Sequence, residues 1–352
     1  MKNMLLNIKL KVRYVISYFE YYLPNKSKII KSEKPKIFLM DVPTYTNLGD
    51  QAIAYSELKF IKDNVDGYEV VEVLGPVLKL HISLLKKYIK KEDILILIGG
   101  GNFGDEYQSI EDNRLNILDI FRNNKICIFP QTIYYNDNER GKIALKKMKA
   151  VLENRDNVLL ITRENYSFEF AKQNFSCRIA LCPDIVLYLS LLKNRKERKG
   201  VLLCLRSDKE KKLDYLNNIV EYLQKKSINY VITDTWLEKS FRFKYREKIL
   251  KEKWNQFSEF KLVITDRLHG MIFSVITNTP CIVMPNYNHK IYSFYNTWFK
   301  DYDYVRFLDD SNFLSRDIEE MLNIDLEKID FKNYKEQYLP ILDFIKGDFE
   351  NE

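Results

Sequence analysis

The stretch LVITDRLHGM, residues 262–271, joins a short apolar run to a polar break and the start of a second apolar run. The first run predicts a buried strand. The break at Thr265-Asp266 predicts a helix N-cap, and a helix is expected over about 267–276. This arrangement places Arg267 and His269 in the first helical turn, at the carboxyl end of a strand. Open α/β sheets bind their ligands at that position.

The residue types at this position indicate an anion site. A helix N-terminus offers unpaired N–H groups and the positive end of a dipole, and Arg267 adds a planar, permanently charged fork. His269, one of only three histidines in the chain, exchanges protons near neutral pH. We therefore expect a site for a small, multiply charged anion that undergoes proton transfer. For this stretch alone an alternative stays open, in which Arg267 pairs with a surface carboxylate and His269 is a core residue.

Composition restricts the class of protein. The chain has 352 residues, of which 46% are hydrophobic, enough for two globular domains. Its five cysteines show neither a CxxC pair nor a zinc-type spacing, so we expect reduced core residues, no metal and a cytoplasmic protein. No apolar run reaches the length of a membrane span, and no cleavable signal is visible.

The formal net charge of +7 suits an anionic substrate or a membrane surface. No nucleic-acid recognition motif accompanies it, so we expect no nucleic-acid partner. Residues 1–23 show apolar residues at helical spacing with lysines and an arginine among them, which predicts a basic amphipathic helix. Such a helix can contact the inner face of a membrane peripherally, or can pack its apolar face on the protein's own core.

From residue 36 onward, strand-like and helix-like segments alternate, which predicts an α/β fold with parallel sheets covered on both faces. The expected division is an N-terminal helix and link (1–35), a first domain (36–192), a charged linker (193–200), a second domain (201–310) and a helical tail (311–352). The two domains would face a central cleft. Strands are expected near 36–42, 69–74, 93–98, 125–130, 158–162, 201–205, 228–233, 260–265 and 280–284. Helices are expected near 50–64, 78–91, 109–123, 139–154, 164–174, 208–226, 238–258 and 267–277.

Two further strand ends carry candidate binding residues. In the segment TYTNLGDQA (44–52), Gly49 permits close approach of a ligand, Asp50 is expected to cap the helix, and Asn47 and Asp50 are candidates to bind or act on sugar hydroxyls. In the segment 94–105 a buried strand leads into Gly99, Gly100 and Gly101, which predicts bare backbone N–H groups for anion oxygens. A turn without a ligand is the alternative for both segments.

Positions 99–104 match G-x-G-x-x-G, but no acidic residue ends the next strand, which disfavours a dinucleotide site.

Several predicted strands are followed by an arginine. Arg163, Arg206 and Arg267 each follow a predicted strand, and two facing domains would direct all three into one cleft. Lys290, after the last strand of the second domain, is a candidate to bind phosphate as a point charge.

In this order, the motifs resemble the polysaccharide pyruvyl transferase family over roughly residues 37–300. The matching positions are Asn47 to Asp50, Gly99 to Gly101 with Asp105, Pro130-Gln131, Arg163 with Ser167, Pro183-Asp184, Arg206, and Asp266 to Gly270. The resemblance extends to bacterial exopolysaccharide-type members through Lys290 and the aromatic residues after it.

The resemblance implies two Rossmann-like domains in a GT-B-like arrangement. It also implies transfer of an enolpyruvyl-derived group from phosphoenolpyruvate, as donor substrate, onto sugar hydroxyls to leave a pyruvate ketal, with no further cofactor. The three arginines, Lys290, Asn47, the glycines and Gln131 would bind substrate. His269 would act as general acid or base, and Asp50 or Asp105 would take the acceptor's proton. The acceptor is a sugar precursor, lipid-linked or free.

Two other functions stay open. One is a GT-B glycosyltransferase with a nucleotide-sugar donor, because the fold does not decide the chemistry. The other is a non-catalytic protein that binds a sugar or an anion. A helix N-terminus lowers the pKa of His269 and a bound phosphate raises it, so the direction of its proton transfer also stays open.

Overall fold

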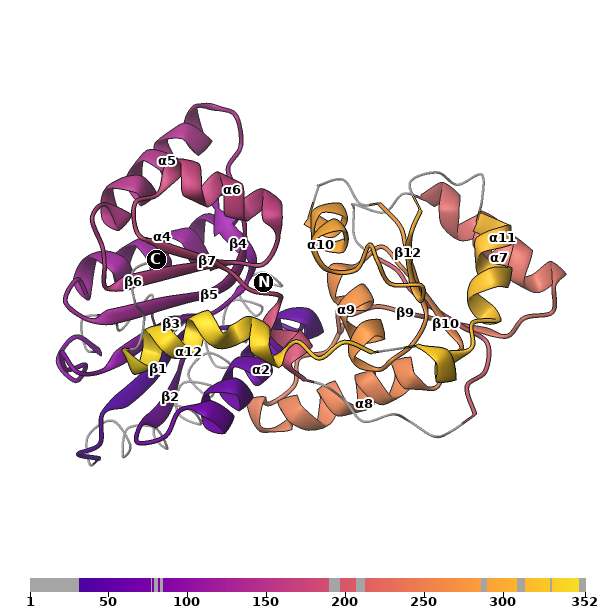
Figure 1. Cartoon of the computed structure of the whole chain (residues 1–352), viewed down its shortest axis with the longest axis horizontal. Helices are drawn as coiled ribbons and strands as arrows, with labels where there is room; N and C mark the ends of the chain where they lie inside the picture. The colour runs from indigo at the N-terminus through magenta and orange to yellow at the C-terminus, as the bar shows by residue number, and fades with distance from the viewer. Residues whose placement is uncertain are drawn as a thin grey trace, which may run out of the picture.

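The computed structural model describes residues 32–76, 78, 82, 85–189, 197–206, 213–285, 290–308, 314–329 and 331–347. These residues form two α/β domains side by side, each built on a parallel sheet (Figure 1). The predicted fold class is therefore confirmed. The helix predicted at 1–23 and part of the predicted linker, 193–196, lie outside the described residues.

The N-terminal sheet has seven strands in the order β2-β1-β3-β5-β6-β7, with β4 paired to β5. Both of its faces are buried. Along β1, Phe38 and Met40 join one hydrophobic cluster, and Ile37 and Leu39 join another on the opposite face. The strands are β1 (Lys36–Val42), β2 (Glu69–Leu74), β3 (Ile94–Leu97), β4 (Gly100–Gly104), β5 (Lys125–Tyr134), β6 (Val158–Thr162) and β7 (Arg178–Leu181). Its helices are α2 (Leu48–Asn64), α4 (Gln108–Ile120), α5 (Glu139–Leu152) and α6 (Asn165–Asn174).

The C-terminal sheet has five parallel strands in the order β12-β11-β10-β8-β9. The strands are β8 (Val201–Cys204), β9 (Tyr230–Thr233), β10 (Leu262–Thr265), β11 (Cys281–Val283) and β12 (Val305–Phe307). The helices around it are α7 (Leu213–Lys225), α8 (Arg246–Ser258), α9 (Leu268–Ile276), α10 (Lys290–Trp298) and α11 (Leu314–Leu322). All five cysteines are free and buried, as predicted.

The chain's last helix returns to the first domain. Helix α12 (Leu339–Lys346) lies over the N-terminal sheet, whereas α11 packs beside α7 in the second domain (Figure 1). Lys125 Nζ donates to the Phe344 carbonyl oxygen at 3.0 Å, and Tyr338 Oη donates to the Asp184 carbonyl oxygen at 2.8 Å. The segment predicted as one helical tail thus divides between the two domains.

Most predicted strands and helices are present, and the differences are local. Strands β4, β7 and β12 and helix α10 were not predicted. The helix expected at 238–258 begins only at Arg246. The glycine segment was predicted to present bare N–H groups, with a turn as the alternative; from Gly100 onward it forms strand β4, in which Gly100 pairs with Gln131.

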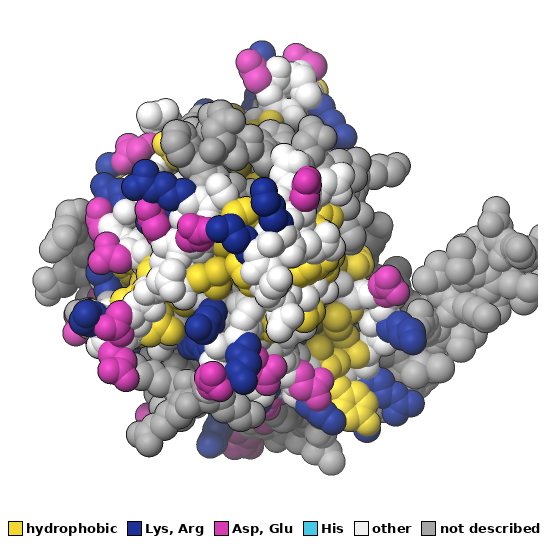
Figure 2. Space-filling model, turned by 90° about the vertical axis from the view of Figure 1, so that its right-hand side faces the viewer, with side chains coloured by type: hydrophobic (Ala, Val, Ile, Leu, Met, Phe, Trp, Pro, Cys, Tyr) yellow, Lys and Arg dark blue, Asp and Glu magenta, His cyan; other side chains and the backbone are white. Residues whose placement is uncertain are grey.

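Figure 2 shows one end of the molecule, where Lys and Arg side chains alternate with Asp and Glu. On this face the positive charge is not gathered into one basic patch. Within the described residues, no helix is both long and apolar enough to cross a membrane.

The two domains are joined by backbone pairing as well as by side chains. Asn47 and Trp236 form an antiparallel bridge, with Leu48 N donating to the Thr235 carbonyl oxygen at 2.8 Å. A second contact is the ion pair between Arg246 of α8 and Glu72 of β2, at 2.9 Å. Its side chains are only 7% and 16% exposed, so this pair is largely removed from water.

We expect Arg246→Met to lower the free energy of unfolding by about 3 kcal/mol, because Glu72 would keep a largely buried charge without its partner. Adding Glu72→Leu should recover much of that loss. The matched control is Lys251→Met, which breaks the exposed Lys251–Glu247 pair and should cost less than about 1 kcal/mol. Denaturant titration of the four proteins measures these differences, and equal losses in the two single variants would contradict the assigned role.

Candidate functional site

A cavity of about 400 Å³ lies between the two domains, where the carboxyl ends of their strands face each other. Several residues that the sequence singled out line it from both sides. The N-terminal domain contributes Asn47, Asp50, Gly101 and Arg163, and the C-terminal domain contributes Arg206, Arg267, His269 and Lys290. The predicted meeting of three arginines and His269 in one cleft is therefore present in the structure.

His269 occupies the first turn of α9, but the cap of this helix differs from the prediction. Arg267 is the N-cap, without a side-chain capping bond, and the helix begins at Leu268. Thr265 Oγ1 accepts a hydrogen bond from Arg267 N at 3.0 Å. Asp266 Oδ1 instead accepts one from Arg206 N at 2.9 Å. Asp266 was thus wrongly predicted as a cap, because its carboxylate ties together the loops that follow β8 and β10.

The imidazole of His269 is held against the opposite domain. A Cβ atom added to Gly49, in the first turn of α2, would lie 2.2 Å from His269 Nδ1. Only a residue without a side chain at position 49 allows the ring to take this place. Gly49 therefore contributes to the site by making room for the imidazole of His269. This role is separate from the close approach of a ligand that was predicted for Gly49.

The electrostatic surroundings keep His269 neutral. Burial lowers the pKa of the imidazole to about 4; Asp184 opposes this shift, while Arg163 and Arg267 add to it. His269 Nε2 lies 3.7 Å from Asp184 Oδ2 and has no hydrogen-bond partner among the described residues. At neutral pH the ring therefore carries no charge, and an approaching anion would raise its pKa.

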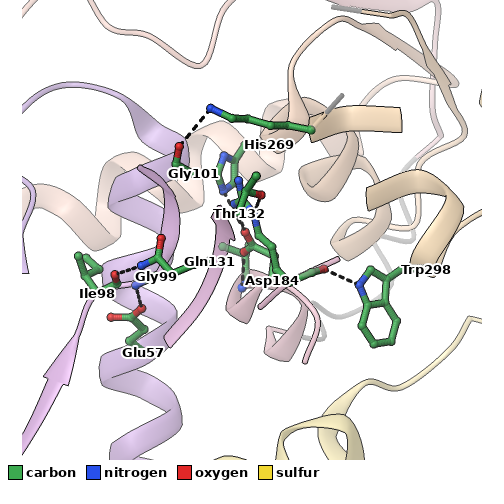
Figure 3. A network of polar contacts seen from close by, with 12 residues as sticks. Glu57, Ile98, Gly99, Gly101, Gln131, Thr132, Asp184, His269 and Trp298 are labelled. Carbon is green, nitrogen blue, oxygen red and sulfur yellow. Dashed lines mark hydrogen bonds and ion pairs between the residues drawn. The ribbon is translucent and has the colours of Figure 1, made fainter. Parts of the chain in front are cut away.

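Arg163 is the most firmly held of the cations. It is 2% exposed, its Nε donates to Thr132 Oγ1 at 2.8 Å, and its Nη1 donates to Asp184 Oδ2 at 2.8 Å. Figure 3 shows Thr132, Asp184 and His269 gathered around one point. A Cβ on Gly101 would lie 2.8 Å from Arg163 Nη2, so this glycine makes room for the guanidinium.

Arg267 and Lys290 also have carboxylate partners. Arg267 Nη2 donates to Asp234 Oδ2 at 2.8 Å. Lys290, the first residue of α10, donates from Nζ to Glu106 Oε2 at 2.9 Å and to the Gly101 carbonyl oxygen at 3.2 Å. These bonds orient the positive groups toward the cavity before any ligand arrives.

Asp50 faces the same cavity from the first turn of α2. Burial raises the pKa of its carboxyl to about 6, against a hydrogen bond from Tyr45 and the charges of Arg163 and Lys290. The predicted capping role is wrong, because the N-cap is Asn47, whose Oδ1 accepts from Gly49 N at 3.0 Å. Asp50 is consequently available to act as a proton acceptor.

At Gly99 the predicted bare N–H group is absent, because it is bonded to a buried carboxylate. Gly99 N donates to the buried Glu57 Oε1 at 2.7 Å. Gly100 lies beside Asp50, since a Cβ added to it would be 3.8 Å from Asp50 Oδ1, and Gly101 lines the cavity. Gln131 is fully buried beneath this segment and donates from Nε2 to the Ile98 carbonyl oxygen at 2.5 Å. Gln131, predicted to bind substrate, therefore supports the segment from outside the cavity.

Asp105 does not reach the cavity. Its Oδ1 accepts from Asn136 N at 2.8 Å and its Oδ2 accepts from Asn136 Nδ2 at 3.0 Å, so both oxygens bind the loop after β5. We therefore withdraw Asp105 as a candidate for the acceptor's proton.

Two residues at the site were not predicted to act there. Asp184 was named only among the positions that match the family's motifs, with no role assigned, yet it fixes Arg163 and lies beside His269. Trp236 lines the cavity and is 49% exposed. Trp236 follows β9 and reaches the site through the backbone bridge to Asn47. The sequence around Trp236 gave no indication of this tertiary contact.

The two Rossmann-like domains with a cleft between them define a protein of the GT-B structural class. UDP-GlcNAc 2-epimerase from Methanocaldococcus jannaschii has this architecture, with a TM-score of 0.51 over 88% of this chain and 99% of its own. Only 14% of residues are identical, so the likeness concerns the fold alone. The family model for polysaccharide pyruvyl transferase matches residues 47–289, and the chain belongs to that family.

Curated relatives agree with this assignment, and the predicted family is confirmed. General stress protein 30 of Bacillus subtilis is 35% identical over 328 residues, which cover 91% of this chain and 94% of that protein. Pyruvyl transferase 1 of Schizosaccharomyces pombe is 28% identical over 316 residues, which cover 83% of this chain and 74% of that protein.

The contact between Gly49 and His269 makes a prediction about stability. Gly49→Ala should destabilise the protein, because the added Cβ would meet the imidazole. In a His269→Ala background the same change should cost much less, because only the contact with the Cβ of residue 269, at 3.0 Å, would remain, and alanine is favoured over glycine in a helix by roughly 0.5–1 kcal/mol.

Chemical denaturation of the wild type, both single variants and the double variant gives the coupling directly. An equal effect of Gly49→Ala in both backgrounds would show that the imidazole does not occupy the space beside Gly49.

Proposed function

We propose that this protein transfers a pyruvyl group from phosphoenolpyruvate to a sugar of a polysaccharide precursor and leaves a pyruvate ketal. Membership of the polysaccharide pyruvyl transferase family supports pyruvyl transfer. The observation that carries the choice of donor is a single buried imidazole placed among cations from both domains.

The donor's charge distribution matches these cations. Phosphoenolpyruvate has a carboxylate and a phosphate on a three-carbon frame, so both anionic groups must be bound within a few ångströms of each other. Arg163 from one domain and Arg206 and Arg267 from the other offer planar forks suited to such groups, and Lys290 adds a point charge.

The reaction needs one proton delivered and two removed. A proton adds to C3 of the donor, and C2 becomes an oxocarbenium centre that an acceptor hydroxyl attacks with loss of its proton. The C2–O bond to phosphate then breaks, and the electron pair leaves with the phosphate. A second hydroxyl of the same sugar attacks C2 and loses its proton, which gives the ketal. Of the two protons released, one replaces the proton consumed at C3 and the other ends on inorganic phosphate.

We assign these proton transfers to His269 and Asp50. The imidazole is neutral at neutral pH, and the donor's negative charges would raise its pKa, so we assign it a proton taken up with the donor and passed to C3. Asp50, whose pKa is raised to about 6, is ionised at neutral pH yet more basic than an ordinary carboxylate. We assign it the proton of the acceptor hydroxyl.

The direct test is incubation with phosphoenolpyruvate and a panel of sugar acceptors, read by phosphate release and by mass. The product should gain the mass of pyruvate less one water. His269→Gln should lose most of the turnover, about a hundredfold or more, with donor binding partly kept. Arg316→Gln, which changes an exposed arginine of α11, is the control and should behave as the wild type.

Nucleotide release from a nucleotide sugar, with none of phosphate from phosphoenolpyruvate, would instead identify a glycosyltransferase. Binding of a sugar or an anion without turnover, unchanged in His269→Gln, would identify a non-catalytic binding protein.

Donor binding should be accompanied by proton uptake near neutral pH. The pKa of His269 is about 4 without ligand, so the ring is deprotonated above that pH, and uptake requires that bound donor raises the pKa past the working pH. The uptake should fall as the pH approaches about 4, where the free ring is half protonated, and vanish well below it. Titration calorimetry in two buffers of different ionisation enthalpy measures it.

His269→Gln is the control for this titration, because the donor's own phosphate also titrates near neutrality. Proton uptake of the same size in the variant and the wild type would contradict the role assigned to the imidazole.

A further inference from the structure

A second cavity, of about 530 Å³, adjoins the first on the side of the N-terminal domain. Its walls come from the loops after β1, β2 and β3 and from helix α4, at the carboxyl edge of the sheet. A space of this size accommodates a small organic ligand. None of the motifs predicted from the sequence required it.

The two cavities share a wall. Tyr45, Asp50, Asn102 and Ile110 line both of them. Arg114 Nη2 donates to Asn102 Oδ1 at 2.8 Å, which fixes the orientation of that amide. A ligand in the second cavity would therefore be within reach of the same carboxylate, Asp50, that faces the first.

The charges of the two cavities differ. Three arginines and Lys290 line the first, whereas the charged side chains among the described residues lining the second are those of Asp41 and Asp50. Carboxylates accept hydrogen bonds from hydroxyl groups and repel other anions. The apolar part of this lining, which includes Pro76 and Ile98, suits the C–H faces of a sugar ring.

Asp41, which lines this cavity, has an unusual backbone conformation. Its φ is +67°, at a register shift where β1 ends, and Asn113 Nδ2 donates to its Oδ1 at 3.1 Å. A Cβ on Gly75 would lie 2.5 Å from Asp41 Oδ1, so Gly75 makes room for the carboxylate. Burial raises the pKa of Asp41 to about 6 even though Arg114 opposes the shift. A strained backbone and a buried carboxylate both cost stability, and such costs concentrate at functional sites.

We propose that the second cavity is the acceptor subsite, that Asp41 binds a hydroxyl of the acceptor there, and that the acceptor residue is a neutral sugar rather than an acidic one. This inference rests on the proposed pyruvyl transfer. It adds the class of the acceptor and the residues that select it. The acceptor ring lies in the second cavity with two hydroxyls directed past Asp50 toward the donor.

The test compares Asp41→Asn with Asp112→Asn, which removes an exposed carboxylate of the same helix, α4, that carries Asn113. Asparagine also tolerates positive φ, so Asp41→Asn preserves the backbone. We expect the KM for a neutral glycoside to rise about tenfold to a hundredfold in Asp41→Asn, because a hydrogen bond to a charged group is lost. Donor binding should not change, and Asp112→Asn should match the wild type.

A matched pair of acceptors, a hexoside and the corresponding uronide, separates binding from a structural role. The wild type should prefer the neutral sugar. Asp41→Asn should narrow that preference, because it removes the repulsion of the uronate. An equal loss for both acceptors would overturn the assignment of Asp41.

A steric variant tests the cavity itself. Ser109→Trp, on the second cavity's side of α4, should abolish acceptor binding while phosphoenolpyruvate still binds, as followed by calorimetry for the donor and by saturation-transfer NMR for the glycoside. Turnover with unchanged acceptor KM in Ser109→Trp and Asp41→Asn would overturn the subsite and leave pyruvyl transfer standing. If phosphoenolpyruvate neither binds nor reacts, but Ser109→Trp still abolishes glycoside binding, the subsite stands and the donor assignment fails.

Discussion

The site depends on the close approach of two helix N-termini across the gap between the domains. The imidazole of His269 on α9 leaves no room for a side chain at Gly49 of α2. The backbone bridge between Asn47 and Trp236 holds the same two loops together. Because the histidine belongs to one domain and its glycine to the other, this arrangement exists only while the domains keep this orientation.

Three of the cations around the imidazole are paired with carboxylates. Arg163 is bound by Asp184, Arg267 by Asp234 and Lys290 by Glu106. Like charges gathered in a partly buried cleft would repel one another, and these carboxylates reduce that repulsion while they fix the direction of each cation. Asp184 also lies beside His269, so it links the arginine that would bind the donor to the group that would protonate it.

Much of the fold could be predicted because buried parallel strands are continuous apolar runs, and the convergence of the arginines followed from their places at strand ends. The errors have local causes. The segment containing Gly99 to Gly101 lacks the side chains that indicate a strand, so β4 was missed. Asn47 and Asp50 are both good caps, and only the three-dimensional register decides between them. Asp41 gave no signal, since its strained conformation arises where β1 shifts register against β2.

The position of Asp50 in the wall between the two cavities accounts for how one base could reach both the acceptor hydroxyl and the reacting carbon of the donor. A carboxylate placed among the donor's cations would compete with the donor for them, and one placed deep in the second cavity would lie far from the reacting carbon. At the boundary, Arg163 and Lys290 keep the group ionised while burial holds its pKa near 6, so it remains basic enough to take a hydroxyl proton. The proposed role of Asp50 thus follows from its position at the shared wall of the two cavities, where the lining changes from arginines and Lys290 to carboxylates.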